Sequence, residues 1–176
     1  MKSYNHYSDD ALVLRKTKLK DSHHSITLLT KHHGKYVLTA FGTRRLLSRR
    51  LSHLETGNVI RCSWREDGDY ATLQETELHY AHSQIKEDSQ KLDFMYLILF
   101  VLFKILPEKE PETEVYESTL RFLKTMHKQD TTVQNVEKFV QKLLMDLGFI
   151  DEEQASAAHF DVFHFIEGII GRKIKV

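Results

Sequence analysis

Short runs of alternating apolar and polar residues fill the first half of the chain and predict β-strands. In Val59–Arg65, the side chains of Ile60, Cys62 and Trp64 alternate with polar neighbours, as in a strand with one buried face. Turn signals separate the runs: His33-Gly34, Thr56-Gly57-Asn58 and Glu66-Asp67-Gly68-Asp69. The predicted strands are residues 11–18, 25–32, 35–42, 59–65 and 70–80.

The second half of the chain has the periodicity of helices. Residues 91–106 are apolar on nearly all sides, which predicts a helix buried on several faces, and Pro107 ends it. Thr131 followed by Gln134 is a capping-box signature that opens a further helix, which Gly148 closes. The remaining predicted helices are residues 114–126 and 160–170.

The order of these elements predicts an α+β protein. Five short strands, with an Arg-rich irregular or helical insertion between the third and fourth, are the layout of an OB-fold β-barrel. Periodicity alone also fits an SH3-like barrel, and the insertion favours the OB-fold. We therefore predict a five-stranded OB-fold DNA-binding domain over residues 1–82 and an all-α helical domain over residues 83–176.

Charge is distributed unevenly along the chain, although the formal net charge is zero. Residues 1–65 hold 13 Lys and Arg against 4 Asp and Glu, a net charge of +9, and the remainder carries −9. A basic first third is the electrostatic signature of nucleic-acid binding. The alternative is a solvated face without a partner.

Several classes of protein are disfavoured. The single cysteine, Cys62, allows neither an intrachain disulfide nor a thiolate zinc cluster. The seven scattered glycines form neither a P-loop nor a dinucleotide fingerprint. The longest apolar run, Phe94–Phe103, is too short to span a bilayer, and the N-terminus lacks a secretory signal. We expect a soluble cytoplasmic protein with no membrane partner, no cofactor and no catalytic residues.

Histidines are the one feature typical of an enzyme, since imidazole binds transition metals. They occur as His23-His24, His32-His33 and His53. Neighbouring residues on a strand face opposite ways, so each pair offers one ligand to a face, and no Asp or Glu at short spacing completes a site. We expect no metal site, and a His-dependent metal hydrolase is the least favoured alternative.

Basic residues recur at spacings that place them on common faces. Lys16, Lys18 and Lys20 occupy every second position of the first strand, and Arg45 and Arg49 stack at i, i+4 if their segment is helical. Arg61 and Arg65 share one face of the fourth strand. Such cations form a groove that tracks phosphates without reading bases.

Four aromatic residues of the barrel are available for base stacking, but a small barrel must also fill its interior. They are Tyr36, Phe41, Trp64 and Tyr70. We therefore expect each of them in the core, Trp64 above all. Tyr36 and Phe41 lie on opposite faces of their strand, so one of the two is a candidate for exposure.

The barrel segment resembles the N-terminal domain of the bacterial recombination mediator RecO. The matching residues are Leu12-Val13-Leu14-Arg15, Leu28-Leu29-Thr30, Gly34-Lys35, Gly42, Arg44-Arg45 and Ser48-Arg49. Weaker similarity continues through Leu73–Leu78, Leu106-Pro107-Glu108, Leu147-Gly148-Phe149 and Phe163–Val176. The four-cysteine zinc module common in the family has no counterpart, since Cys62 is the sole cysteine.

The resemblance implies a non-enzymatic protein that binds single- and double-stranded DNA, anneals complementary strands and helps load recombinase. Its implied partners are the tail of single-stranded-DNA-binding protein and RecR. The predicted DNA-binding residues are Arg15, Lys16, Lys18, Lys20, Lys35, Arg44, Arg45, Arg49, Arg50, Arg61 and Arg65. For the partner tail, the apolar helix around Phe94–Phe103 offers a candidate groove, with Lys104, Arg121 or Lys124 meeting its carboxylates. The alternatives are that these apolar residues are simply core, and that the barrel no longer binds DNA.

Overall fold

A computed structural model describes residues 5–20, 23–41, 51–157, 159–171 and 173. The chain forms two compact units. The first comprises residues 1–82 and 106–117, and the second comprises residues 83–105 and 118–176. The sequence predicted that the helical domain holds all of residues 83–176. The structure instead groups residues 106–117 with the barrel.

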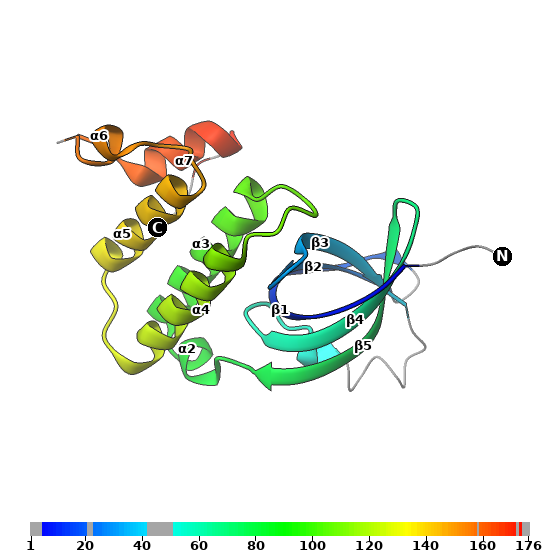
Figure 1. The fold of residues 1–176 in the computed structure, drawn as a ribbon. Coiled ribbons are helices and arrows are strands. Elements are labelled where there is room, and N and C mark those ends of the chain that lie inside the picture. Colours follow the sequence, from blue (N-terminus) through cyan, green and yellow to red (C-terminus); the bar gives the residue numbers. More distant parts are fainter. Residues whose placement is uncertain (1–4, 21–22, 42–50, 158, 172, 174–176) are drawn as a thin grey trace. The chain divides into compact units, whose positions relative to one another are not determined.

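The first unit is a closed five-stranded barrel with the strand order β1-β2-β3-β5-β4 (Figure 1). Its strands are β1 (Asn5–Lys18), β2 (His24–Thr30), β3 (Gly34–Ala40), β4 (Val59–Asp67) and β5 (Tyr70–Tyr80). Neighbouring strands are antiparallel except β3 and β5, which pair in parallel at Thr39 and Thr72. This barrel followed by helices confirms the predicted α+β class and OB-fold.

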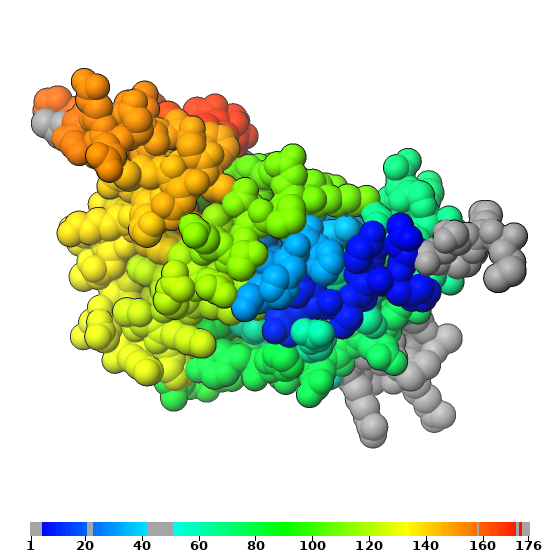
Figure 2. Space-filling view, in the orientation of Figure 1, coloured from blue at the N-terminus to red at the C-terminus, as the bar shows by residue number. Residues whose placement is uncertain are grey.

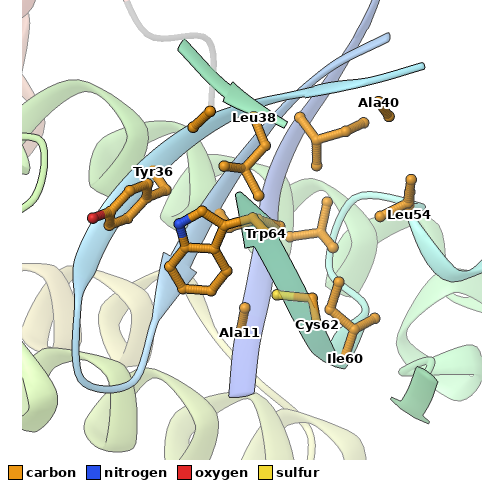
Figure 3. Packing of buried hydrophobic residues seen from close by; sticks show 12 residues of the cluster. Ala11, Tyr36, Leu38, Ala40, Leu54, Ile60, Cys62 and Trp64 are labelled. Carbon is orange, nitrogen blue, oxygen red and sulfur yellow. The ribbon is translucent and has the colours of Figure 1, made fainter. Parts of the chain in front are cut away.

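The inward-facing residues of the alternating strands form the barrel core. Ile60, Cys62 and Trp64 of β4 are all buried, as their spacing predicted. Trp64 is fully buried and lies beside Tyr36 and Leu38 of β3 (Figure 3). Apolar burial of this kind supplies most of the free energy that holds a small barrel closed.

Strand β1 is longer than predicted, because it begins at Asn5 rather than at Ala11. Its first part pairs with β4 from Asn5 to Leu12, and its second part pairs with β2 from Ala11 to Lys18. The register shifts between Val13 and Arg15, which is typical of a bulge that bends a strand. This one bent strand therefore pairs with both β2 and β4, and its pairing closes the barrel.

Residues 106–117, the return segment, follow the barrel along the β2–β3 hairpin (Figure 2). The Lys109 amide donates to the Lys35 carbonyl at 2.9 Å, and the Thr113 hydroxyl donates to the Lys31 carbonyl at 2.8 Å. Gly34 has a φ of +78°, and a Cβ placed there would lie 2.0 Å from the Glu110 carbonyl oxygen. Only glycine permits this approach, which explains the glycine after the turn.

The second unit holds most of the helices: α2 (Ser83–Glu87), α3 (Ser89–Ile105), α5 (Val133–Asp146), α6 (Glu152–Ala155), α7 (Val162–Ile170) and the greater part of α4 (Thr113–Lys128). Helix α3 is buried along most of its apolar residues, which confirms the predicted helix buried on several faces. The N-cap of α5 is Thr132, paired with Asn135, one residue after the predicted capping box. Among the described residues, no helix is both long and apolar enough to cross a bilayer.

Candidate nucleic-acid interface

The described members of the predicted DNA-binding set lie in two separate regions of the barrel. Lys16 and Lys18 pair with the start of β2, whereas Arg61 lies opposite Asp10 of β1. Asp10 precedes Lys18 by eight residues, or roughly 26 Å of extended strand. The structure therefore does not gather all these cations on one side.

The first region is the open end of the β2–β3 hairpin, which we define as Lys18, Lys20, His23, His24 and Phe41. Lys18 pairs with His24, and His24 pairs with Ala40, so three strands meet there. The β1–β2 turn is closed by two bonds: the Leu19 amide to the His23 carbonyl, and the His23 amide to the Lys20 carbonyl. Lys18 and Lys20 are both exposed.

The electrostatics of the open end are positive. The pKa of His24 lies below its usual value, chiefly because burial disfavours the charged ring, and also because Lys16 and Lys18 repel a further charge. Glu55 opposes this effect and forms an ion pair with Lys16. Lys16 is thus partly neutralised, which leaves Lys18 and Lys20 as the better candidates for phosphate contacts.

The second region is the outer face of β4, and its cations have acidic neighbours. Arg61 forms an ion pair with Asp10 at 3.2 Å and lies opposite Glu77 in the sheet. Arg65 lies opposite His6 of β1 and Thr72 of β5, four residues further along β4. The shared face that the spacing predicted exists, but Arg61 balances acidic side chains there.

Two more predicted residues have contrasting environments. Arg15 is exposed and pairs with Thr27 across β1 and β2. Lys35 is 9% exposed, and its backbone bridges to Glu108 of the return segment. We therefore exclude Lys35 from the candidate surface. The alternation of β3 did not predict this burial, and Glu108, to which the backbone of Lys35 bridges, is 73 positions away in the sequence.

Arg44, Arg45, Arg49 and Arg50 lie outside the described residues. The described residues on either side of this segment lie at one end of the barrel. Phe41 lies at the open end beside His23, with ring centroids 4.9 Å apart. On the other side, Leu54 packs into the barrel core and Glu55 pairs with Lys16. Both flanks of the Arg-rich segment thus return to the same end of the barrel as Lys18.

The four aromatic residues divide into two kinds. Tyr36 and Trp64 are buried in the core, as expected, and their ring centroids lie 4.9 Å apart. Phe41 is 57% exposed and Tyr70 is 80% exposed, so the core expectation was wrong for both. The opposite-face argument for Tyr36 and Phe41 is confirmed, with Phe41 as the exposed member.

The paired histidines have a structural partner that the sequence did not indicate. Buried Asp9 accepts hydrogen bonds from Nδ1 of His32 at 2.9 Å and Nδ1 of His33 at 3.0 Å, and from the His32 amide at 2.7 Å. The opposite-face argument was wrong here, because the two residues lie in a turn. Within the described ranges, no group of three or more His, Cys, Asp or Glu side chains has the geometry to hold a metal ion.

Burial alone would raise the pKa of Asp9, but hydrogen bonds from His32, His33 and Asp10 together lower it below its usual value. Burial raises the pKa of the Cys62 thiol to about 12, so this cysteine is not a nucleophile at neutral pH. The Asp9–histidine group and Cys62 are the residue types here that most resemble an enzyme site, and the surroundings of both favour a structural role.

The cations predicted to meet a partner tail lie on two helices of the second unit. Lys104 is in the last turn of α3, where its Nζ lies 5.8 Å and 5.7 Å from the ring centroids of Phe100 and Phe103. Arg121 and Lys124 are exposed on α4. Most apolar residues of Phe94–Phe103 are buried, which favours the core alternative over a groove.

Comparison with known proteins gives a consistent result. Residues 1–82 match the family model described as "Recombination protein O N terminal". The chain is 28% identical over 159 residues to "DNA repair protein RecO" of Methylobacterium nodulans, covering 86% of this chain and 61% of that protein. It is 30% identical over 133 residues to the RecO of Thermodesulfovibrio yellowstonii, covering 73% of this chain and 53% of that one.

A third relative, the RecO of Symbiobacterium thermophilum, is 25% identical over 144 residues, covering 81% of this chain and 57% of that protein. The matches thus extend beyond the barrel into the helices, while the chain spans between about half and three fifths of the length of these relatives. The OB-fold barrel, the family model over residues 1–82 and these relatives agree, and the chain is similar to RecO proteins over most of its length.

Proposed function

We propose that this chain is a non-enzymatic, DNA-binding mediator of recombination and repair. It binds single- and double-stranded DNA, anneals complementary strands and helps load recombinase onto strands covered by single-stranded-DNA-binding protein. It acts in the cytoplasm with a RecR-like partner. Annealing needs no chemical energy, because a basic surface lowers the repulsion between strands and base pairing supplies the driving force.

The observation that carries the proposal is the cationic open end of a RecO-type OB barrel. Exposed Lys18 and Lys20 lie there, and the pKa of His24 is lowered chiefly by burial and further by Lys16 and Lys18. Both flanks of the segment with four arginines return to this end. OB barrels bind single strands through such a combination of a basic groove and exposed aromatic rings.

A titration of the purified protein with a fluorescently labelled single-stranded oligonucleotide, at salt concentrations from 50 to 200 mM, tests the proposal. If about six phosphates are neutralised, affinity for the single strand falls roughly three-hundredfold over this range. Replacing Arg44, Arg45, Arg49 and Arg50 by Ala together is expected to weaken binding and flatten this dependence.

The competing function is a protein-interaction module whose barrel no longer binds DNA. Two observations favour it: the ion pair between Arg61 and Asp10, and the burial of Lys35. The same titration separates the two functions. DNA affinity that is unchanged in the fourfold Arg variant, or absent in the wild type, rejects the DNA-binding proposal and leaves the interaction module.

The helical unit is proposed to bind the tail of single-stranded-DNA-binding protein, with Lys104, Arg121 and Lys124 as the candidate contacts. A peptide with an acidic segment and an apolar C-terminus is the appropriate probe. Binding that weakens when these three residues are replaced by Ala supports this assignment, and binding that is unchanged rejects these residues.

A further inference from the structure

Phe41 is a large apolar side chain that the barrel does not use for its core. In β3 the inward positions are Tyr36, Leu38 and Ala40, all of which belong to the core cluster. Continuing this alternation places Phe41, just after the strand, on the outer side, and 57% of it is exposed. A single exposed aromatic ring is not by itself evidence of binding, so its surroundings decide whether it has a role.

The ring of Phe41 is held in place although it is exposed. The His23 ring meets it at an interplanar angle of 70°, with the centroids 4.9 Å apart. His23 is itself fixed by the β1–β2 turn, where its carbonyl accepts from the Leu19 amide at 2.8 Å and its amide donates to the Lys20 carbonyl at 3.2 Å. A restrained ring loses little conformational freedom when a ligand stacks on it.

Two lysines lie at the same end of the barrel as this ring. Lys18, His24 and Ala40 form one cross-strand row, so their side chains share one face and the Cα atoms of Lys18 and Ala40 are about 10 Å apart. Phe41 is the next residue after Ala40, and exposed Lys20 bonds through its carbonyl to His23. Lys18 thus points to the opposite face of the strands from Phe41, and the two meet at the rim of the open end. An exposed ring and exposed lysines on one rim provide the chemistry that recognises a nucleotide base and its adjoining phosphates.

We propose that Phe41 stacks on an unpaired base of a DNA strand whose phosphates lie along Lys18 and Lys20. This inference rests on the proposed DNA-binding function and adds a specificity to it. In a duplex the bases are stacked on one another and their faces are covered, so Phe41 favours single strands whereas the lysines serve both forms of DNA.

Tyr70 provides a matched comparison on the same barrel. It is more exposed than Phe41, at 80%, but it follows the acidic turn that contains Asp67 and Asp69. These carboxylates repel phosphates, so exposure of the ring alone does not make Tyr70 a stacking site. Phe41 and Tyr70 are thus both exposed, but they differ in the sign of the charges near the ring.

The test compares Phe41→Ala, Phe41→Trp and Tyr70→Ala in affinity for a single-stranded oligonucleotide and for a duplex of the same length. Phe41→Ala is expected to lose about tenfold in single-strand affinity and less than twofold in duplex affinity. Phe41→Trp retains binding, and its indole fluorescence is quenched by the single strand. The native Trp64 is fully buried and serves as the baseline, measured in the wild-type protein.

Tyr70→Ala is expected to leave both affinities within twofold of wild type. Circular dichroism and thermal melting check that each variant is folded. A wild-type protein that binds no DNA overturns the proposed function and this inference together. If the wild-type protein binds DNA normally, two results overturn the stacking role alone. Either Phe41→Ala loses no affinity for the single strand, or it loses affinity for the duplex to the same extent.

Discussion

The two ends of the β2–β3 hairpin have opposite characters. At the turn, Asp9 collects hydrogen bonds from His32 and His33, and the Thr30 hydroxyl donates to the Gly34 carbonyl at 2.8 Å. The return segment packs against this end. At the open end, Lys18 and Phe41 are exposed, and the pairing of β2 with β3 ends at His24 and Ala40.

This difference indicates that the two ends of the hairpin have different roles, one in folding and the other in binding. Polar groups at the turn are paired with one another around the buried Asp9 carboxylate, so changing them affects folding. Cationic and aromatic groups at the open end face solvent, so changing them affects binding and leaves stability within about 0.5 kcal/mol. The following substitutions test this division.

The largest effect is expected from Gly34→Ala at the turn. The new Cβ would lie 2.0 Å from the Glu110 carbonyl oxygen and would occupy a positive φ. We expect a loss of about 3 kcal/mol or more in the free energy of unfolding, measured by urea denaturation, because the backbone must shift as well as bear the strained φ.

Gly68→Ala is the control for this experiment. Gly68 also has a positive φ, of +59°, but an added Cβ meets no atom within 4 Å. Its expected cost is about 1–2 kcal/mol from the backbone conformation alone. Equal losses in the two variants would show that the approach of the return segment to Gly34 contributes nothing.

A smaller loss, of about 2 kcal/mol, is expected from Asp9→Asn, because an amide cannot accept hydrogen bonds from both histidine rings as a carboxylate does. The pKa of Asp9 is lower in the folded protein than its ordinary 3.8. Its contribution to stability is therefore complete above about pH 4 and is lost as the pH falls through the folded pKa.

Urea denaturation of both proteins between pH 7 and pH 3 measures this effect, and the difference between them should narrow on acidification. Asp10→Asn is a suitable control, since the Asp10 side chain is partly exposed and pairs with the exposed side chains of Arg61 and His79. Its expected cost is below about 1 kcal/mol. A constant difference between wild type and Asp9→Asn across this range would contradict the role given to Asp9.

The smallest change in free energy is expected at the open end. Replacing Lys18 and Lys20 together by Ala should weaken single-strand binding by roughly five- to tenfold at physiological salt and reduce the log–log salt slope by about 1.4. Thermal stability should not change. Arg61→Ala is the control, because its charge is balanced by Asp10. A slope change in Arg61→Ala as large as in the lysine variant would place the interface on β4 instead.

Local patterns were sufficient to predict most of the barrel. The bounds of β5 agree with the prediction, and β4 differs only by two residues at its end. Asn5–Asp10 was missed because its residues are mostly polar and carry no alternation, and it becomes a strand only by pairing with β4. The position of the return segment was missed for the same reason, since it depends on contacts distant in sequence.

The candidate site was predictable in residue type and not in arrangement. Spacing predicted that Lys16, Lys18 and Lys20 share a face of the first strand, but β1 ends at Lys18, so Lys20 lies beyond it. Spacing also could not show that Glu55 forms an ion pair with Lys16. The sequence placed Phe41 and Tyr36 on opposite faces of the strand, but it could not show that Phe41 is the exposed residue and Tyr36 the buried one. No local signal joined Asp9 to His32, because the fold alone brings these distant residues together.

The return segment also has a consequence for synthesis on the ribosome. When residue 82 has left the exit tunnel, all five strands exist, yet the Lys35 carbonyl still lacks the amide of Lys109, and Lys31 lacks Thr113. The nascent barrel acquires these bonds only after α3 has also been made. Completion of the N-terminal fold is thereby delayed until the helical half of the polypeptide has begun to emerge.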